Sequence, residues 1–474
     1  MVGDMAYFIR HVAGLVLESA SFKTELIMTK IIQKYDRRYA IGKWIINQVM
    51  RLYHRAIWIS GLEKIPKKTP VVYGPNHQNA LIDALALIYS IPGQPVFLAR
   101  ADIFKKRFLA WLFRGIKMLP VYRIRDGIDN LDHNDEIFEQ AKRVLVDRKI
   151  LALFPEAVHN PLRRLLPLKK GIPRIVFLTE EAYDFKLGTV VIPVGIYYSD
   201  TDRFDETLHI QFGDPIPVAD FRELFKINPQ KAHLALRDAM AEGMRPLMID
   251  IRDKEHYIMY ECIRHLYNKP MRERLYVNGD SQPLRFKADK AIIDMVEKNT
   301  RDNPARLKML NEKAVKYVEL LSENGIEPRH FYPSVKQVIV PLRLFTSLLL
   351  LPFFLYGGLN HLFPILVGMI ASKKIPDPQF ISSVKFAVGF LITPLFYLLQ
   401  FFIVQSIVHN WLISFAYLLT LPVAFILFKL CRRYMKTTLI LKRSHRMRRK
   451  NPGQWEIVSQ LTAEMKAILN EMQL

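Results

Sequence analysis

The chain is poor in cysteine. Among its 474 residues only Cys262 and Cys431 occur, and they lie far apart in the sequence. Two such residues exclude a disulfide framework and a cysteine-based zinc site, and they suit a reducing compartment. We therefore expect no metal in the functional site.

Several familiar motifs are also missing. The sequence holds no G-x-S-x-G elbow, which argues against a serine hydrolase. It holds no G-x-x-x-x-G-K-[S/T] loop, which argues against a nucleotide-driven transporter. No convincing secretory signal is present, because Asp4 stands where basic residues belong and Arg10 interrupts the apolar run.

Acidic residues are outnumbered: 45 Asp and Glu face 68 Lys and Arg, a formal net charge of +23. The field of such a basic chain attracts anionic partners, namely nucleic acid, anionic lipid or phosphorylated substrates. No nucleic-acid recognition motif accompanies the charge. The apolar blocks near the C-terminus favour an anionic lipid membrane as partner, and we expect no nucleic-acid partner.

Three stretches near the C-terminus are almost free of charge, and each has the roughly 20 apolar residues that a membrane span needs. They are Leu344–Ala371, Val384–Val408 and Trp411–Leu430. The first contains Pro352 and Pro364, so a broken or re-entrant hairpin suits it better than one straight helix.

Positive residues flank these stretches, and such residues stay on the cytoplasmic side. The predicted topology has the first stretch dipping in and returning and the other two forming a spanning hairpin. Both termini, and with them the part of the chain before the first stretch, are then cytoplasmic. The alternative is three simple spans with the termini on opposite sides.

The rest of the chain predicts an α/β fold. Short β runs alternate with helical stretches over residues 54–220, which favours a layered sheet-and-helix domain with ligands near its strand ends. Residues 1–53 are predicted to be amphipathic and helical, either lying in a membrane interface or packed on the core. The further expected parts are a charged helical extension (221–335), a C-terminal α-helical membrane region (336–435) and a basic cytoplasmic tail (436–474).

One turn carries the strongest candidate chemistry. An apolar run ends at Gly74-Pro75, and Asn79 is a good N-cap for a helix that follows. His77 lies in the turn and Asp83 in the helix, so they can pair only if the turn curls back. A carboxylate on one imidazole nitrogen leaves the other free as a general base. The alternative is an ordinary turn, with Asp83 complementing the helix dipole.

Three later stretches carry weaker signals, each of which in isolation also fits solvated or core residues. Arg123 follows an apolar run and can present a planar fork of donors to phosphate. Glu156 follows a proline at a predicted strand end, where ligands bind in open sheets. Pro193 interrupts an apolar strand, which predicts an edge or a bulge.

Together, in this order, these stretches resemble the blocks of the glycerophospholipid acyltransferase family, which includes glycerol-3-phosphate and lysophosphatidic acid acyltransferases. The resemblance covers roughly residues 55–215. It implies that His77 and Asp83 are the catalytic pair and that Arg123 binds the acceptor's phosphate. It also implies that Glu156 binds the acceptor and that Pro193 belongs to the acyl-binding block.

Two departures stand out. Five residues separate His77 from Asp83, where most of the family has four, and this resembles the glycerol-3-phosphate/dihydroxyacetone-phosphate branch. Ala157 stands where the family usually has glycine, and alanine is strained at positive φ. The acceptor contact is therefore expected to shift toward His159, Arg163 or Arg164.

The resemblance implies a membrane-bound O-acyltransferase. The donor is an acyl-CoA or acyl carrier protein thioester, with no other cofactor, and the acceptor is glycerol 3-phosphate or 1-acylglycerol 3-phosphate. Lys169 or Lys170 is expected to assist Arg123. The alternative is a degenerate family member that acts as a lipid-binding or scaffolding membrane protein.

Overall fold

The computed structural model describes residues 32–105, 107–122, 133–201, 203–301, 303–331 and 339–474. Its strands are β1 (Ala56–Ser60), β2 (Val71–Pro75), β3 (Val96–Arg100), β4 (Met118–Val121), β5 (Ile150–Leu153), β6 (Val190–Tyr198), β7 (Thr207–Phe212) and β8 (Ile216–Pro217). They form one sheet in the order β1-β7-β6-β2-β5-β3-β4, with β8 paired to β6. All neighbours from β6 to β4 are parallel, whereas β7 and β8 are antiparallel to β6.

Helices cover both faces of the sheet. Strands β2 and β6 are buried at every position, as continuous apolar runs in a two-sided parallel sheet should be. Side chains alternate between two cores: Val72 and Val191 point to one face, Val71 and Ile192 to the other. The first face packs on α5 (His133–Val146), α6 (Gly171–Glu181) and α8 (Pro229–Met244), and the second on α2 (Arg37–Tyr53) and α3 (Ala80–Ser90). Two shorter helices are α4 (Arg107–Gly115) and α7 (Arg222–Ile227).

Pro193 corrects one expectation. The strand that holds it is not at an edge, because β6 lies between β2 and β7. Pro193 sits where β6 changes partner from β8 to β7, and its carbonyl accepts from the N–H of Gly213 at 2.9 Å. The missing N–H of the proline therefore falls at a junction and interrupts no continuous ladder.

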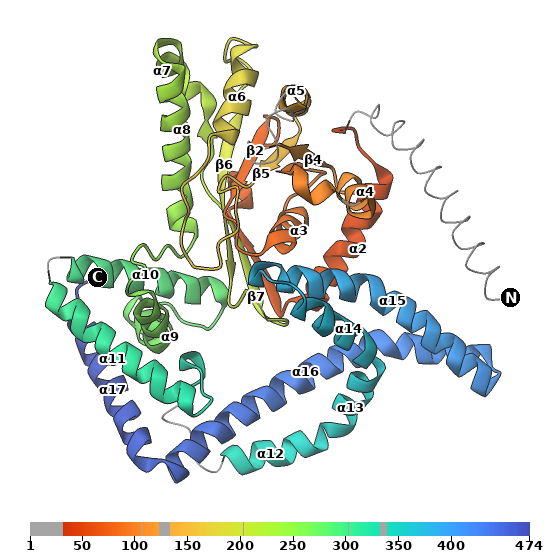
Figure 1. Cartoon of the computed structure of the whole chain (residues 1–474), viewed down its shortest axis with the longest axis vertical. Helices are drawn as coiled ribbons and strands as arrows, with labels where there is room; N and C mark the ends of the chain where they lie inside the picture. The colour runs from red at the N-terminus through yellow and green to blue at the C-terminus, as the bar shows by residue number, and fades with distance from the viewer. Residues whose placement is uncertain (1–31, 106, 123–132, 202, 302, 332–338) are drawn as a thin grey trace.

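A second hydrophobic core is purely helical. It is formed by α9 (Tyr257–Arg274), α10 (Gln282–Thr300), α11 (Pro304–Glu323) and α17 (Pro452–Glu471). Residues 436–474, which the sequence separates as a tail, thus share a core with the extension, and the C-terminus lies beside α10 (Figure 1). Helices α7 and α8, by contrast, pack with the sheet, so the extension from residue 221 is divided between the two cores.

The apolar helices lie on one side of the sheet (Figure 1). They are α12 (Ile339–Leu349), α13 (Leu351–Asn360), α14 (Leu362–Lys373), α15 (Ile381–Val408) and α16 (Trp411–Lys450). Among the described residues, α15 and α16 are long and apolar enough to cross a membrane, and α12 with α13 is a third candidate, bent by 52°. The predicted break in the first apolar stretch is confirmed, while the membrane topology stays a prediction.

Candidate active site

The carboxyl ends of four neighbouring parallel strands meet at one edge of the sheet. The turn with His77 follows β2, the loop with Glu156 follows β5, and Arg100 ends β3. Ligands bind outside such strand ends in open sheets. Arg123 follows β4 but lies outside the described residues, so its phosphate-binding role stays a prediction.

The predicted pairing of His77 with Asp83 is confirmed. His77 Nδ1 lies 2.8 Å from Asp83 Oδ2, and the Asp83 side chain is 0% exposed. The same carboxylate oxygen accepts from the backbone N–H of Gln78 and of Asn79, at 2.8 and 2.7 Å, and Tyr198 donates to Oδ1 at 2.7 Å. Because an ionised carboxylate only accepts, Nδ1 carries the hydrogen, and Nε2 is the nitrogen left to take up a proton.

The turn reaches this geometry by an unexpected route. Asn79 occupies the N-cap position of α3, but its side chain does not cap the helix and donates instead to the carbonyl of Thr201 at 2.9 Å. The prediction of a side-chain cap at Asn79 is therefore wrong. Asp83 takes over by accepting the two N–H groups before the helix, and Ala80 adopts a φ of 41° at the first helical residue. Strain of this kind is typical of functional sites.

The backbone of His77 is held from both sides. Its N–H donates to Glu156 Oε1 at 3.0 Å, and its carbonyl accepts from the N–H of Asn160 at 2.9 Å. Glu156 Oε2 accepts from the N–H of Leu166 at 3.2 Å. Burial raises the pKa of Glu156 to about 8, against the opposing effect of these backbone bonds. Glu156 thus ties the loop after β5 to the turn after β2, and its acceptor contact stays a prediction.

Aromatic rings enclose the imidazole. The ring of His77 stacks on Phe154 with centroids 4.0 Å apart, and the ring of His159 meets it edge-on, also at 4.0 Å. His159 contacts Phe380 of η8 (Pro378–Phe380) at 5.0 Å, so the segment before α15 closes the site. Burial and then the charge of His77 lower the pKa of His159 to about 4. His159 is therefore neutral at physiological pH, a hydrogen-bonding group rather than a cation.

Arg100 is a candidate that the sequence reasoning missed. It ends β3, pairs in register with Val121 of β4, and its charge contributes to lowering the pKa of His159. Its side chain is held by Asp102, with Nε at 3.1 Å from Oδ1. The available signal was a cation directly after the apolar run Val96–Ala99, the same pattern that singles out Arg123.

Ala157 adopts the backbone conformation of the glycine it replaces. Its φ is 59°, in the left-handed region. A left-handed residue other than glycine costs about 1–2 kcal/mol. Ala157 therefore has the strained positive φ considered from the sequence, and the shift of the acceptor contact toward His159, Arg163 or Arg164 stays a prediction.

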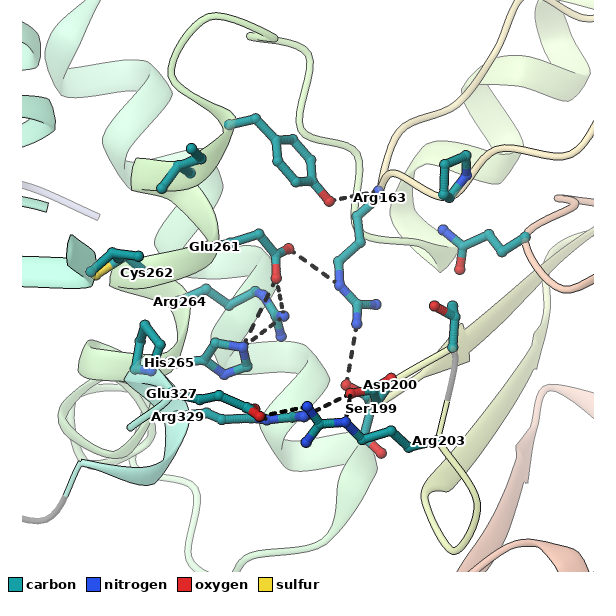
Figure 2. Close-up of a pocket in the computed structure, with 17 residues that line it drawn as sticks. Arg163, Ser199, Asp200, Arg203, Glu261, Cys262, Arg264, His265, Glu327 and Arg329 are labelled. Atoms are coloured by element: carbon teal, nitrogen blue, oxygen red, sulfur yellow. Dashed lines mark hydrogen bonds and ion pairs between the residues drawn. The ribbon is translucent and has the colours of Figure 1, made fainter. Parts of the chain in front are cut away.

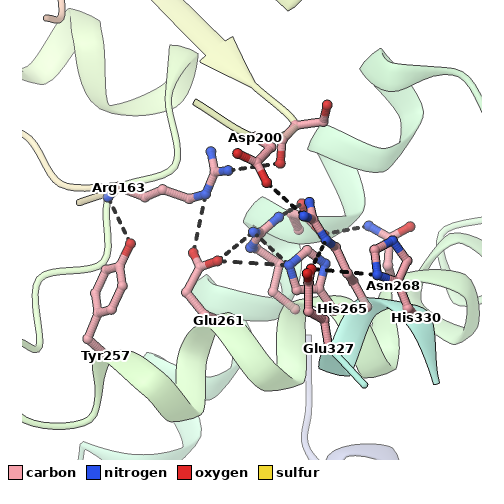
Figure 3. Close-up of polar contacts among 12 residues, drawn as sticks. Arg163, Asp200, Tyr257, Glu261, His265, Asn268, Glu327 and His330 are labelled. Atoms are coloured by element: carbon pink, nitrogen blue, oxygen red, sulfur yellow. Dashed lines mark hydrogen bonds and ion pairs between the residues drawn. The ribbon is translucent and has the colours of Figure 1, made fainter. Parts of the chain in front are cut away.

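Arg163 faces a different cavity, of about 410 Å³, which Gln78 also lines (Figure 2). Its Nε lies 3.2 Å from Glu261 Oε1, and its Nη2 donates to the carbonyl of Ser199 at 3.3 Å (Figure 3). The guanidinium of Arg163 is thus already paired with the carboxylate of Glu261 and lines this cavity. No contact of Arg163 with the imidazole of His77 is found among the described residues.

The remaining predicted residues lie away from the imidazole as well. The side chain of Lys169 is exposed, and Lys170 Nζ is 3.4 Å from Gln230 of α8. The carbonyl of Arg164 accepts from the side-chain amide of Asn160 at 2.6 Å. Pro193 is buried against α8, where a Cβ on Gly243 would lie 2.7 Å from its Cγ. No contact among the described residues joins these side chains to His77, and their substrate roles stay predictions.

Chemically, the site offers the imidazole of His77 with a fixed tautomer, held by a buried carboxylate and enclosed by the rings of Phe154 and His159, and such an imidazole can act as a general base. Among the described residues, no group of three or more His, Cys, Asp or Glu side chains is placed to hold a metal ion.

Residues 56–197 match the family model "Acyltransferase". The chain is 25% identical over 228 residues to glycerol-3-phosphate O-acyltransferase 2 of Saccharomyces cerevisiae, covering 46% of this chain and 29% of that relative. It is 23% identical over 149 residues to glycerol-3-phosphate O-acyltransferase 1 of the same yeast, covering 31% of this chain and 19% of that relative. The alignments thus span under a third of these relatives.

Among solved structures, the 1-acyl-sn-glycerophosphate (LPA) acyltransferase PlsC of Thermotoga maritima is 20% identical, with a TM-score of 0.32, over 48% of this chain and 87% of that one. The family model covers β1 to β5 and nearly all of β6, together with the turn that holds His77 and the loop that holds Glu156. The chain therefore carries, over residues 56–197, a domain of the acyltransferase family.

Proposed function

We propose that this protein is a membrane-bound O-acyltransferase. It moves a fatty acyl group from a thioester donor to the hydroxyl of a glycerol-phosphate-type acceptor, glycerol 3-phosphate or 1-acylglycerol 3-phosphate. The observation that carries the proposal is the 2.8 Å contact between His77 Nδ1 and the buried Asp83 carboxylate. The family model and the names of the yeast relatives support the reaction class and the acceptor class.

In the proposed reaction, Nε2 of His77 removes the proton from the acceptor hydroxyl as that oxygen attacks the thioester carbonyl. The carbon–sulfur bond breaks, the thiolate leaves with its carrier and takes up the proton, and no residue becomes acylated. Asp83 holds the tautomer and stabilises the imidazolium. A positioned base contributes about a hundred- to ten-thousand-fold in rate, and alignment of the two substrates adds to this.

For the acceptor's phosphate we propose Arg123 together with Arg100, because β3 and β4 are adjacent parallel strands that end at the same edge. The acyl chain and a lipid product are insoluble in water. The apolar helices α15 and α16 would therefore anchor the protein in the membrane, where both of them dissolve. Basic residues near an anionic leaflet contribute about 1 kcal/mol each. We place the catalytic domain on the cytoplasmic side, following the flanking charges.

The test is acyl transfer by the purified full-length chain in lipid nanodiscs. The donors are labelled acyl-CoA and acyl carrier protein thioester, and the acceptors are glycerol 3-phosphate, dihydroxyacetone phosphate and 1-acylglycerol 3-phosphate. His77→Ala should lower turnover by about a thousandfold or more while the protein stays folded and in the membrane.

The chain offers a matched control in a second histidine–aspartate pair, since His256 Nδ1 lies 2.6 Å from Asp253 Oδ2 in the loop before α9. His256→Ala should retain activity within about twofold, because this partly exposed pair bonds within its own loop and such pairs contribute little. Near-normal turnover in His77→Ala removes this residue as the base. An absence of transfer to any acceptor favours a lipid-binding or scaffolding role instead.

A further inference from the structure

Helix α16 carries two kinds of basic residue where its apolar half ends. Lys429 and Arg433, one turn apart, both reach the buried carboxylate of Asp205, at 3.3 and 2.7 Å. The side chains of Arg432 and Lys436, also one turn apart, form no ion pair or hydrogen bond with another described residue, although Arg432 lies 5.6 Å from the ring of Phe204. The charges of Lys429 and Arg433 on one face of the helix are thus compensated by Asp205, whereas Arg432 and Lys436 on the adjacent face have no such carboxylate partner.

Arg432 and Lys436 line a cavity of about 390 Å³, and Arg443 of the same helix lines it too. The only carboxylate among its described lining residues is that of Glu327, which forms ion pairs with Arg203 and Arg329. Residues 332–338, which lie outside the described part of the chain, contain no aspartate or glutamate. The described lining of the cavity therefore carries more positive than negative charge.

Part of the cavity wall is apolar. Phe354 of α13 lines it, and so do Leu439 and Ile440, which lie on α16 between Lys436 and Arg443. Phe354 stacks on Phe428 of α16 with centroids 5.1 Å apart. One turn further along α13, a Cβ on Gly357 would lie 2.5 Å from the carbonyl oxygen of Ala424, so the two helices pack closely.

The cavity lies close to where the apolar part of α16 ends. Helices α12 and α13 run antiparallel beside α16, since Ser347 meets Thr438 at 3.4 Å while Phe354 meets Phe428 (Figure 1). The uncharged run of α16 ends at Phe428, directly before Lys429, and the first residue of α16 that lines the cavity is Arg432. A cavity close to this boundary, lined by both cationic and apolar side chains, matches the headgroup level of a lipid.

We propose that this cavity binds the phosphate of an anionic phospholipid, with Arg432, Lys436 and Arg443 holding the phosphate and Phe354 contacting the first methylenes of an acyl chain. Guanidinium and ammonium groups make charge-assisted hydrogen bonds to phosphate oxygens. The proposal is independent of the chemistry at His77, since none of these residues touches that site.

The test is a titration of delipidated full-length protein in neutral detergent, with thermal stabilisation as the readout. The probes are dioctanoyl phosphatidic acid, dioctanoyl phosphatidylcholine and inorganic phosphate. Phosphatidic acid should stabilise the wild type at concentrations at least about tenfold lower than either of the others. Equal responses to phosphate and phosphatidic acid mean a soluble-anion site and overturn the lipid assignment. Equal responses to the two lipids overturn the charge argument.

A double variant, Arg432→Gln with Lys436→Gln, should weaken phosphatidic acid binding about tenfold or more. The matched control is Lys442→Gln with Arg446→Gln, which removes the same two residue types from exposed positions of the same helix. It should change binding by less than about twofold. Equal losses in the two doubles indicate general attraction to a basic helix and overturn the proposal.

Phe354→Ala tests the apolar wall without altering charge. It should weaken phosphatidic acid binding and leave the response to inorganic phosphate unchanged. Parallel losses for both probes, or no loss for either, contradict a lipid chain beside Phe354.

Discussion

The hydroxyl of Ser383 accepts a hydrogen bond from the N–H of Leu81 at 3.1 Å, although 302 residues separate the two. The same hydroxyl donates to the carbonyl of Asn79 at 3.3 Å, and the adjacent Ser382 donates to the carbonyl of Thr201 at 2.6 Å. Ser383 lies in the first turn of α15, one of the two long apolar helices. The turn that aims His77 is therefore held in part by a helix suited to the membrane.

Ser383→Ala should lower kcat about tenfold, with a small change in KM. The substitution leaves the N–H of Leu81 without its partner, at a cost of about 1–3 kcal/mol beside a strained residue. Ser383→Thr keeps the hydroxyl and should restore activity. Ser406→Ala is the control, because Ser406 lies on the same helix and donates only to its own helix, at Ile403. Equal kcat values in the two alanine variants contradict the coupling.

Tyr198→Phe should lower kcat about tenfold. It removes the 2.7 Å hydrogen bond to Asp83 Oδ1 and loosens the carboxylate that orients His77. The neighbouring Tyr197 points to the opposite side, into the helical core, where it donates to Asp289 at 3.0 Å. Tyr197→Phe should therefore lower the unfolding free energy, by about 1 kcal/mol, and leave kcat unchanged. Steady-state kinetics and thermal denaturation of both variants distinguish the two effects.

Ala157→Gly should leave the fold equally stable or stabilise it by up to about 1 kcal/mol, because glycine adopts a positive φ without a Cβ clash. The reverse change at Gly188, whose φ is 78° and whose Cβ would meet nothing within 4 Å, should destabilise by about 1 kcal/mol. Chemical denaturation measures the free energy of unfolding of both variants. Activity that survives in Ala157→Gly shows that the alanine is not itself needed; a marked destabilisation contradicts the strain argument.

Acid should destabilise the fold below about pH 6.5. Burial lowers the pKa of His54, His159, His209 and His330 to about 4 from the ordinary 6.5. Between these values the unfolded chain binds more protons, so stability is complete above pH 6.5 and falls as the pH drops toward 4. The loss is on the order of 1 kcal/mol or more per histidine.

Thermal denaturation at pH 7 and at pH 5 measures the predicted loss of stability. His209→Gln should make the difference in stability between the two pH values smaller, since glutamine can still bond to Ser60 but does not titrate. The raised pKa of Glu156 acts in the opposite sense, because its contribution is lost as the pH rises from 4.5 toward 8. An unchanged pH dependence in His209→Gln rules out this histidine as a contributor.

Much of the sheet could be predicted from sequence. The short β runs expected within residues 54–220 include the strands Ala56–Ser60, Val71–Pro75 and Ile150–Leu153, because continuous apolar β-prone segments suit a two-sided sheet. Val96–Arg100 was missed, since five residues without alternation carry little periodic signal. The packing of α17 into the helical core was also missed, because its basic flank reads as a tail.

The site divides in the same way. His77 and Asp83 could be paired from sequence because both belong to one local turn. Tyr198 and Phe380 come from distant segments, and only the tertiary fold brings them to that turn. The bracing role of Glu156 depends on hydrogen bonds to backbone groups of two other segments, which leave no pattern in residue types.

Helix α16 has 40 residues, and at about 1.5 Å per residue it is about 60 Å long, twice the hydrocarbon thickness of a bilayer. Its outer half therefore projects well beyond any membrane that the apolar half enters. Because Lys429 and Arg433 fix Asp205 to this projecting part, the height and rotation of the sheet above the lipid are set by one continuous helix. In the proposed reaction, this fixed height brings an acyl chain drawn from the bilayer and the acceptor together at one depth.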